Sequence, residues 1–64
     1  MSHKDINELT DMVNTCHRIG SEVLLDYADY LLDRICYLRL SLNQEPLQHE
    51  WDGRKAWNEK YNTI

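Results

Sequence analysis

A chain of 64 residues has room for one small domain, and its length alone excludes a two-domain enzyme. Hydrophobic residues make up 42% and charged residues 28%, with two Gly and one Pro, which is typical of a folded chain rather than a disordered one. The net charge of −4 argues against a protein that mainly grips nucleic-acid phosphates.

Apolar stretches in this chain are all short. Charges interrupt each of them before the roughly 18 residues that a membrane span needs. Residues 1–5 are polar and lack the apolar core of a secretory signal. We therefore expect a single small helical domain over residues 1–64 that resides in the cytoplasm and has no membrane partner.

The first predicted helix covers residues 3–19. Ser2 followed by Asp5 is close to a capping box and would start this helix. Gly20 fits a helix C-terminus that needs positive φ, and Ser21 fits the N-cap of the next helix, so we predict a tight corner here. One long helix running through the glycine is the alternative. The apolar residues recur at three- and four-residue steps as one stripe: Ile6, Leu9, Met12, Val13, Cys16 and Ile19.

The second predicted helix covers residues 22–42 and carries an apolar seam of the coiled-coil type. Leu25, Leu32 and Cys36 widen this seam on one side. In an antiparallel hairpin the seam would face the stripe of the first helix, with Ile6 opposite Ile35. The seam residues alternate four- and three-residue steps: Leu24, Ala28, Leu31, Ile35, Leu38 and Leu42.

A third, short helix is predicted at about residues 53–62. Asn43 ends the second helix, and Pro46 fits the first position of a new segment. Gly53 fits a turn or the start of the last helix, which carries Trp57. The predicted fold class is therefore all-α: an antiparallel helical hairpin with a short C-terminal helix.

An acidic row follows the second helix at spacings of four, three and four. We interpret it as a solvated face, with no metal and no cofactor. The alternatives are mimicry of nucleic-acid phosphates and a Mg²⁺ site in a metal-dependent hydrolase, because Mg²⁺ prefers carboxylate oxygens. The row consists of Glu22, Asp26, Asp29 and Asp33.

The two cysteines are predicted to be reduced core residues. In the hairpin, Cys16 and Cys36 are about 15 Å apart along the helix axes at 1.5 Å per residue, which exceeds the reach of a disulfide. No Gly-rich turn or oxyanion donor set accompanies a cysteine or histidine. We therefore predict that the chain is not an enzyme.

A second stripe on the middle helix is the feature most suggestive of function. It consists of Val23, Tyr27, Tyr30, Arg34 and Tyr37. Tyrosine and arginine are enriched at binding hot spots because each buries a large surface and keeps a polar tip. The first helix alone cannot cover both this stripe and the apolar seam. Three alternatives remain for what packs on this stripe: the C-terminal aromatic residues, a second copy of the chain, or another protein.

The sequence therefore predicts a small interaction module that regulates or inhibits another protein and also self-associates. We expect a homodimer, a larger protein target, or both. A small nucleic-acid-binding regulator is the alternative, with Arg54, Lys55 and Lys60 beside Trp57, although we expect no nucleic-acid partner at this net charge. The predicted contact residues are Val23, Tyr27, Tyr30, Arg34, Tyr37, Trp51 and Trp57.

Overall fold

The computed structural model describes residues 3–61, with side chains from residue 5 onward. This part contains the helices α1 (His3–Ile19), α2 (Glu22–Ser41) and α3 (Gln48–Tyr61), and no strand. The predicted all-α fold of a hairpin and a short C-terminal helix is confirmed. Ser2, the predicted first cap, and Asn62, the predicted last helical residue, lie outside the described residues.

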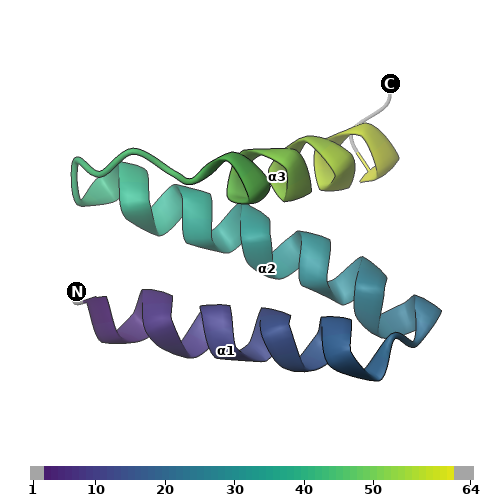
Figure 1. Cartoon of the computed structure of the whole chain (residues 1–64). Coiled ribbons are helices and arrows are strands. Elements are labelled where there is room, and N and C mark those ends of the chain that lie inside the picture. The colour runs from purple at the N-terminus through teal and green to yellow at the C-terminus, as the bar shows by residue number, and fades with distance from the viewer. Residues whose placement is uncertain (1–2, 62–64) are drawn as a thin grey trace.

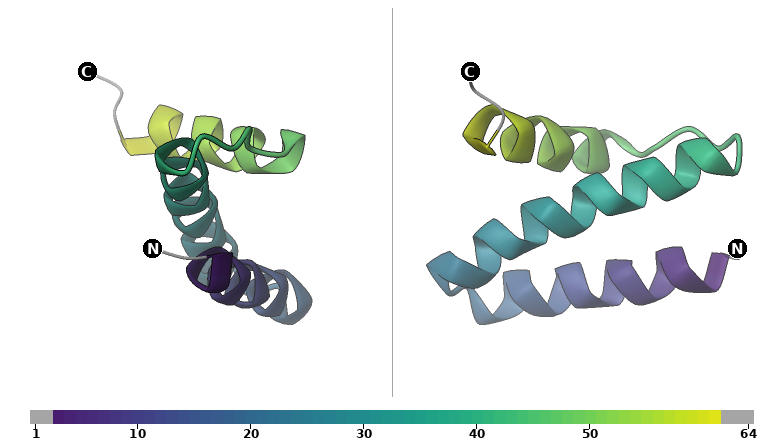
Figure 2. Two further views of the ribbon diagram at one scale, coloured as in Figure 1. Left: turned by 90° about the vertical axis from the view of Figure 1, so that its left-hand side faces the viewer. Right: turned by 180° about the vertical axis from the view of Figure 1, so that it is seen from behind.

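The helix α2 lies in the middle, with α1 on one side and α3 on the other (Figure 1). The end-on view in Figure 2 shows that α3 crosses α2 at an angle. Within residues 3–61, α1 and α3 each pack on α2 and do not contact one another. The Cα trace spans 30 × 30 × 18 Å, so the three helices form a flat arrangement.

The core between α1 and α2 consists of the two predicted apolar stripes. Met12 and Ile19 are exceptions, because 42% and 62% of their surfaces are exposed. Met12 is adjacent to buried Val13, and neighbours on a helix diverge by about 100°, while Ile19 ends α1 at the corner. Leu25 on α2 is likewise exposed. The buried members are Ile6, Val13, Cys16, Ala28, Leu31, Ile35 and Leu38, with Leu9, Leu24 and Leu42 partly buried against them, and Leu32 of the same cluster lies against Gly53 of α3.

The corner between α1 and α2 forms at the predicted glycine. Gly20 has φ of +74°, and its N–H donates to the carbonyl of Cys16 at 3.0 Å, which is the left-handed helix ending. The alternative of one long helix is therefore wrong. Ser21 occupies the N-cap of α2 with extended backbone (φ −65°, ψ 139°), but its side chain makes no capping hydrogen bond.

The end of α2 is a Schellman motif, which confirms the predicted stop at Asn43. This residue has φ of +59°, and its N–H donates to the Leu40 carbonyl at 3.1 Å. The N–H of Gln44 donates to the Arg39 carbonyl at 2.8 Å. Asparagine is the residue that most often replaces glycine at such a left-handed position.

The helix α3 begins at Gln48, five residues before its predicted start, and Pro46 precedes it rather than opening it. The carboxylate of Glu50 accepts the N–H of Leu47 at 3.0 Å, which is one half of a capping box and stabilises this earlier start. Gly53 is therefore an interior helical residue, not a turn.

Gly53 lets the backbone of α3 approach α2 closely. A Cβ added to it would lie 2.3 Å from Leu32 Cδ1 and 2.5 Å from Leu32 Cβ. Because Leu32 Cβ is fixed to the backbone of α2, a larger residue must push the two helices apart. The glycine thus has a packing role that outweighs its poor helix propensity.

We expect Gly53→Ala to lower the free energy of unfolding by about 1–3 kcal/mol through overpacking. This loss should appear even though alanine alone favours a helix by about 1 kcal/mol. Urea denaturation followed by circular dichroism measures the change, with Lys55→Ala, at an exposed position of α3, as the control. A Gly53→Ala variant as stable as the parent would contradict the close approach.

Candidate interaction surface

The helix α3 covers one edge of the aromatic stripe of α2. The ring of Trp57 lies 5.2 Å from that of Tyr30 and 4.2 Å from that of Tyr61, between centroids. Tyr27 stacks on Tyr30 at 5.8 Å. Of the three alternatives left open, the C-terminal aromatic residues therefore supply a part of the cover: Trp57 contacts the stripe at Tyr30, Tyr61 packs on Trp57, and Trp51 contacts Arg54 instead.

The last turn of α3 is held by Asp26 of α2. Its carboxylate accepts hydrogen bonds from Lys60 Nζ and from the Tyr61 hydroxyl, the latter at 2.6 Å. The bond from Lys60, followed by that from Tyr61, lowers the pKa of Asp26 below its ordinary 3.8. The same carboxylate raises the pKa of Lys60 above 10.5 and that of Tyr61 above 10.0.

The acidic row of α2 is not the solvated face that we predicted. Asp33 Oδ1 lies 3.6 Å from Arg54 Nε, Asp26 bonds Lys60, and burial raises the pKa of Asp29 above 3.8. Of the four residues, Glu22 is the one that stays exposed. Two of the four carboxylates, Asp26 and Asp33, therefore help to hold α3.

The cations of the predicted basic patch are largely engaged within the molecule. Arg54 contacts Asp33 and also places its guanidinium 5.6 Å from the ring centroid of Trp51. Lys60 bonds Asp26, whereas Lys55 is exposed. A patch with two of its three cations paired to carboxylates offers little positive charge to a phosphate backbone.

Arg39 and Glu50 form an ion pair that the sequence analysis missed. Arg39 Nε and Nη2 donate to the two carboxylate oxygens of Glu50 at 2.7 and 3.1 Å. Glu50 is only 1% exposed, and Arg39 Nη1 also donates to the side chain of Gln44 at 3.2 Å. Glu50 stands at capping-box spacing from Leu47, which indicates a helix start, but no local pattern marks its pairing with Arg39, eleven residues earlier.

Four residues of the predicted stripe remain outside the cover of α1 and α3. Val23 is 77%, Tyr27 42% and Tyr37 61% exposed, and the exposed Arg34 places its guanidinium 5.6 Å from the Tyr37 ring centroid. Tyr30, Trp51 and Trp57 are half-buried. We call the exposed set, Val23, Tyr27, Arg34 and Tyr37, the open face of α2.

A groove runs between α1 and α2 beside the open face and shares Arg34 with it. Its volume is about 310 Å³. Three charged and three apolar side chains line it, so it presents both kinds of contact. We call it the α1–α2 groove, and it is lined by Asp5, Glu8, Leu9, Met12, Arg34 and Leu38. Its α1 residues were not among the predicted contact residues, although Met12 and Val13 are neighbours and cannot both face the seam.

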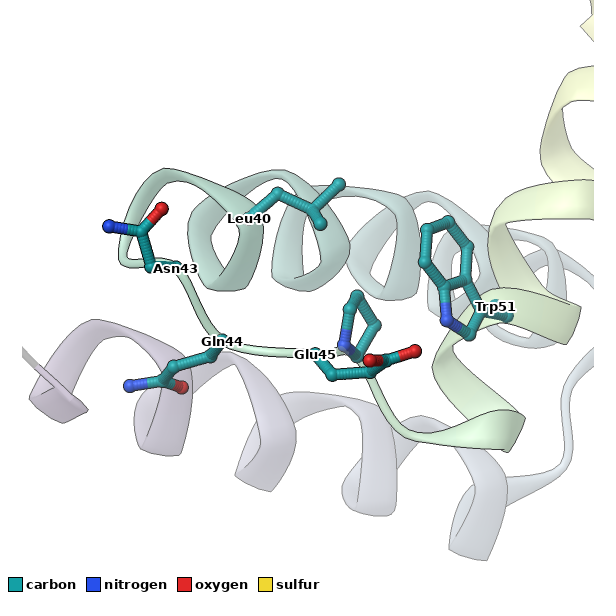
Figure 3. Close-up of a pocket in the computed structure, with 6 residues that line it drawn as sticks. Leu40, Asn43, Gln44, Glu45 and Trp51 are labelled. Atoms are coloured by element: carbon teal, nitrogen blue, oxygen red, sulfur yellow. The ribbon is translucent and has the colours of Figure 1, made fainter.

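A second hollow, of about 400 Å³, lies at the turn between α2 and α3. Figure 3 shows Leu40 and Trp51 pointing toward one another across it, while the amides of Asn43 and Gln44 point away. Glu45 is the one titratable residue that lines it. A single carboxylate without a base or nucleophile beside it provides no catalytic arrangement.

Groups suited to metal binding or nucleophilic chemistry are not assembled among the described residues. No three His, Cys, Asp or Glu side chains there are placed to hold a metal ion. Cys16 and Cys36 are buried free thiols, as predicted. Burial, followed by the nearby Glu50, raises the pKa of Cys36 above 9.0, which keeps it in the unreactive thiol form.

We expect Arg39→Met to lower the free energy of unfolding by about 3 kcal/mol, because it leaves a buried carboxylate without its partner. Arg54→Met, which removes a half-exposed pair, should cost about 1 kcal/mol or less. Urea denaturation followed by tryptophan fluorescence compares the two. The double variant Arg39→Met with Glu50→Met should be more stable than Arg39→Met alone. Equal losses for Arg39→Met and Arg54→Met would contradict the dominant role of the buried pair.

We expect Asp26 to make the docking of α3 sensitive to acid. Its folded-state pKa lies below 3.8, so its contribution is complete above pH 3.8 and is lost as the pH falls through the folded-state value. Lys60, with a raised pKa, loses its contribution as the pH rises past 10.5. Thermal melting should show Asp26→Asn less stable than the parent at pH 7 and equal to it in strong acid. Asp52→Asn, exposed on α3, is the control, and a gap that persists in acid would contradict this account.

Comparison with protein-family models, with curated proteins and with solved structures finds no match for this chain. Within residues 3–61, no helix combines the length and the apolar character needed to cross a membrane. The open face of α2 and the adjoining α1–α2 groove are therefore the features from which a function can be inferred.

Proposed function

We propose that this chain is a small helical interaction module that docks on another protein and regulates it. The open face of α2 is the contact surface. The observation that carries this proposal is the exposure of Val23, Tyr27 and Tyr37 on a face that neither α1 nor α3 covers. A second copy of the chain on the same face is the other form of the proposal.

The residue types of the open face suit a binding surface. Tyr27 and Tyr37 each offer a large ring with few rotatable bonds, and Arg34 adds a guanidinium that stacks on aromatic rings. In a chain this small, leaving such side chains exposed forgoes stabilisation that the fold could use. Contact with a partner recovers that stabilisation.

The fold presents this face in a fixed arrangement. The α1 side of α2 is held by the apolar core, and the other side is held by the Arg39–Glu50 pair and the Trp57 ring. A face held on both sides loses little conformational entropy when a partner binds. This rigidity supports a role as a docking module, in which occupation of a target's surface is itself the regulatory event.

Site-specific photocrosslinking tests the proposal. With p-benzoylphenylalanine in place of Tyr37, we expect one discrete crosslinked product in a lysate of the source organism, and none with the same probe at Glu59, which is exposed on α3. Arg34→Ala should weaken the product strongly, because it removes a hot-spot residue type from the face.

The mass of the product distinguishes the two forms of the proposal. A product of twice the chain's 7.7 kDa identifies a second copy, and a larger one identifies a different target. Equal labelling from Tyr37 and Glu59, or none from either, would overturn the proposal.

A further inference from the structure

The α1–α2 groove carries features that specify the chemistry of a partner. We propose that it receives an amphipathic helix of another protein, with apolar anchors flanked by basic residues. This inference rests on the proposed docking function and adds the class of partner and the place where it binds.

The carboxylates of α1 differ from those that hold α3. Asp26, Asp33 and Glu50 are each paired with a cation of the chain. Residues 5–12 contain three acidic residues and no basic one, and among residues 5–61 neither Asp5 nor Glu8 has an ion-pair partner. Among the side chains that the structure describes, the α1 edge of the groove therefore carries negative charge that no ion pair engages, which favours a positively charged partner.

The interior of the groove is apolar and adaptable. Leu38 is buried, Leu9 is half-buried, and Met12 leaves 42% of its surface exposed. Methionine is common at surfaces that bind helices, because its flexible thioether fits varied apolar side chains. An incoming helix would cover the exposed part of Met12. This burial removes apolar surface from water and so favours binding.

The length of the groove fits a helix rather than a small molecule. Asp5 and Met12 are seven residues apart on α1, or about 10 Å and two turns at 1.5 Å per residue. Apolar anchors at i, i+3 or i+4, and i+7 of a bound helix match that span. The volume of about 310 Å³ is at the low end of small-molecule pockets, which measure roughly 300–1,000 Å³.

The two edges of the groove carry opposite charge and so give a bound helix an orientation. Asp5 and Glu8 lie on the α1 edge, while Arg34 lies on the α2 edge and joins the groove to the open face. A partner helix with lysine or arginine toward α1 satisfies the first edge. An acidic side chain, or the negative end of the helix dipole, satisfies Arg34.

A second copy of this chain is a poorer occupant than a basic helix of another protein. The helix with most cations here is α3, and two of its three, Arg54 and Lys60, contact carboxylates of α2. Offering them to the groove of another copy would break those contacts. The charge of the groove therefore points to a different protein as the source of the helix.

Fluorescence anisotropy with a labelled synthetic peptide tests this inference on the full chain. The peptide has about 14 residues, or four helical turns, with leucine on one face and lysine on the other, and a matched peptide carries glutamate in place of each lysine. We expect the lysine peptide to bind saturably with one peptide per chain, and binding to weaken as salt is added. The glutamate peptide should bind at least about tenfold more weakly.

Two pairs of matched variants locate the site. Met12→Ala should weaken binding about tenfold, and Ile19→Ala, which removes a more exposed apolar side chain of α1 outside the groove, should not change it. Asp5→Asn with Glu8→Gln should weaken binding about three- to tenfold. Asp52→Asn with Glu59→Gln, which removes the same charge from exposed positions of α3, should leave it unchanged. Circular dichroism checks that each variant keeps its helicity.

The outcomes separate this inference from the proposed function. Three results would overturn the proposal that the groove binds a basic helix. These are equal effects of Met12→Ala and Ile19→Ala, equal effects of the two charge variants, and a lack of saturable peptide binding. A crosslinked product at Tyr37 alongside any of those results would leave the docking function standing without this partner class. If the peptide binds the groove but the probe at Tyr37 gives no crosslinked product, the open face is not part of the interface.

Discussion

The buried ion pair between Arg39 and Glu50 is the constraint on which the α2–α3 half of the molecule depends. One carboxylate accepts two bonds from a guanidinium and one from the N–H of Leu47, so it caps α3 while tying that helix to α2. Arg39 also bonds Gln44, which shapes the turn that leaves α2. The pair thereby stabilises the start of α3 and joins α3 to the end of α2, which the Schellman motif at Asn43 sets.

That arrangement explains why α2 has two different long edges. One edge meets α1 through apolar side chains, where packing sets the contact. The other meets α3 through Asp26 and Asp33 and through the Tyr30 and Trp57 rings. The open face is the part of α2 that neither α1 nor α3 covers. Its position therefore follows from where these two helices pack on α2, and not from a lack of apolar character in its residues.

The hairpin could be read from the sequence because its signals are local and periodic. Gly20 marked the corner, Asn43 marked the end of α2, and the seam around Ile35 identified the core. The start of α3 could not be read, because Gly53 next to an aspartate resembles a turn until the proximity of Leu32 is known. The groove was missed for a similar reason, since only the packed hairpin decides whether Met12 or its neighbour Val13 is buried.

Because α1 and α3 contact only α2, every helix–helix contact in the described residues joins helices that are consecutive in the chain. Such short-range topology favours rapid folding, since no long loop must close before the helices meet. Assembly can begin at either turn and spread along the shared middle helix, much as a repeat protein grows from neighbour to neighbour. In this respect the fold behaves as a linear array of three units rather than as a bundle closed around one centre.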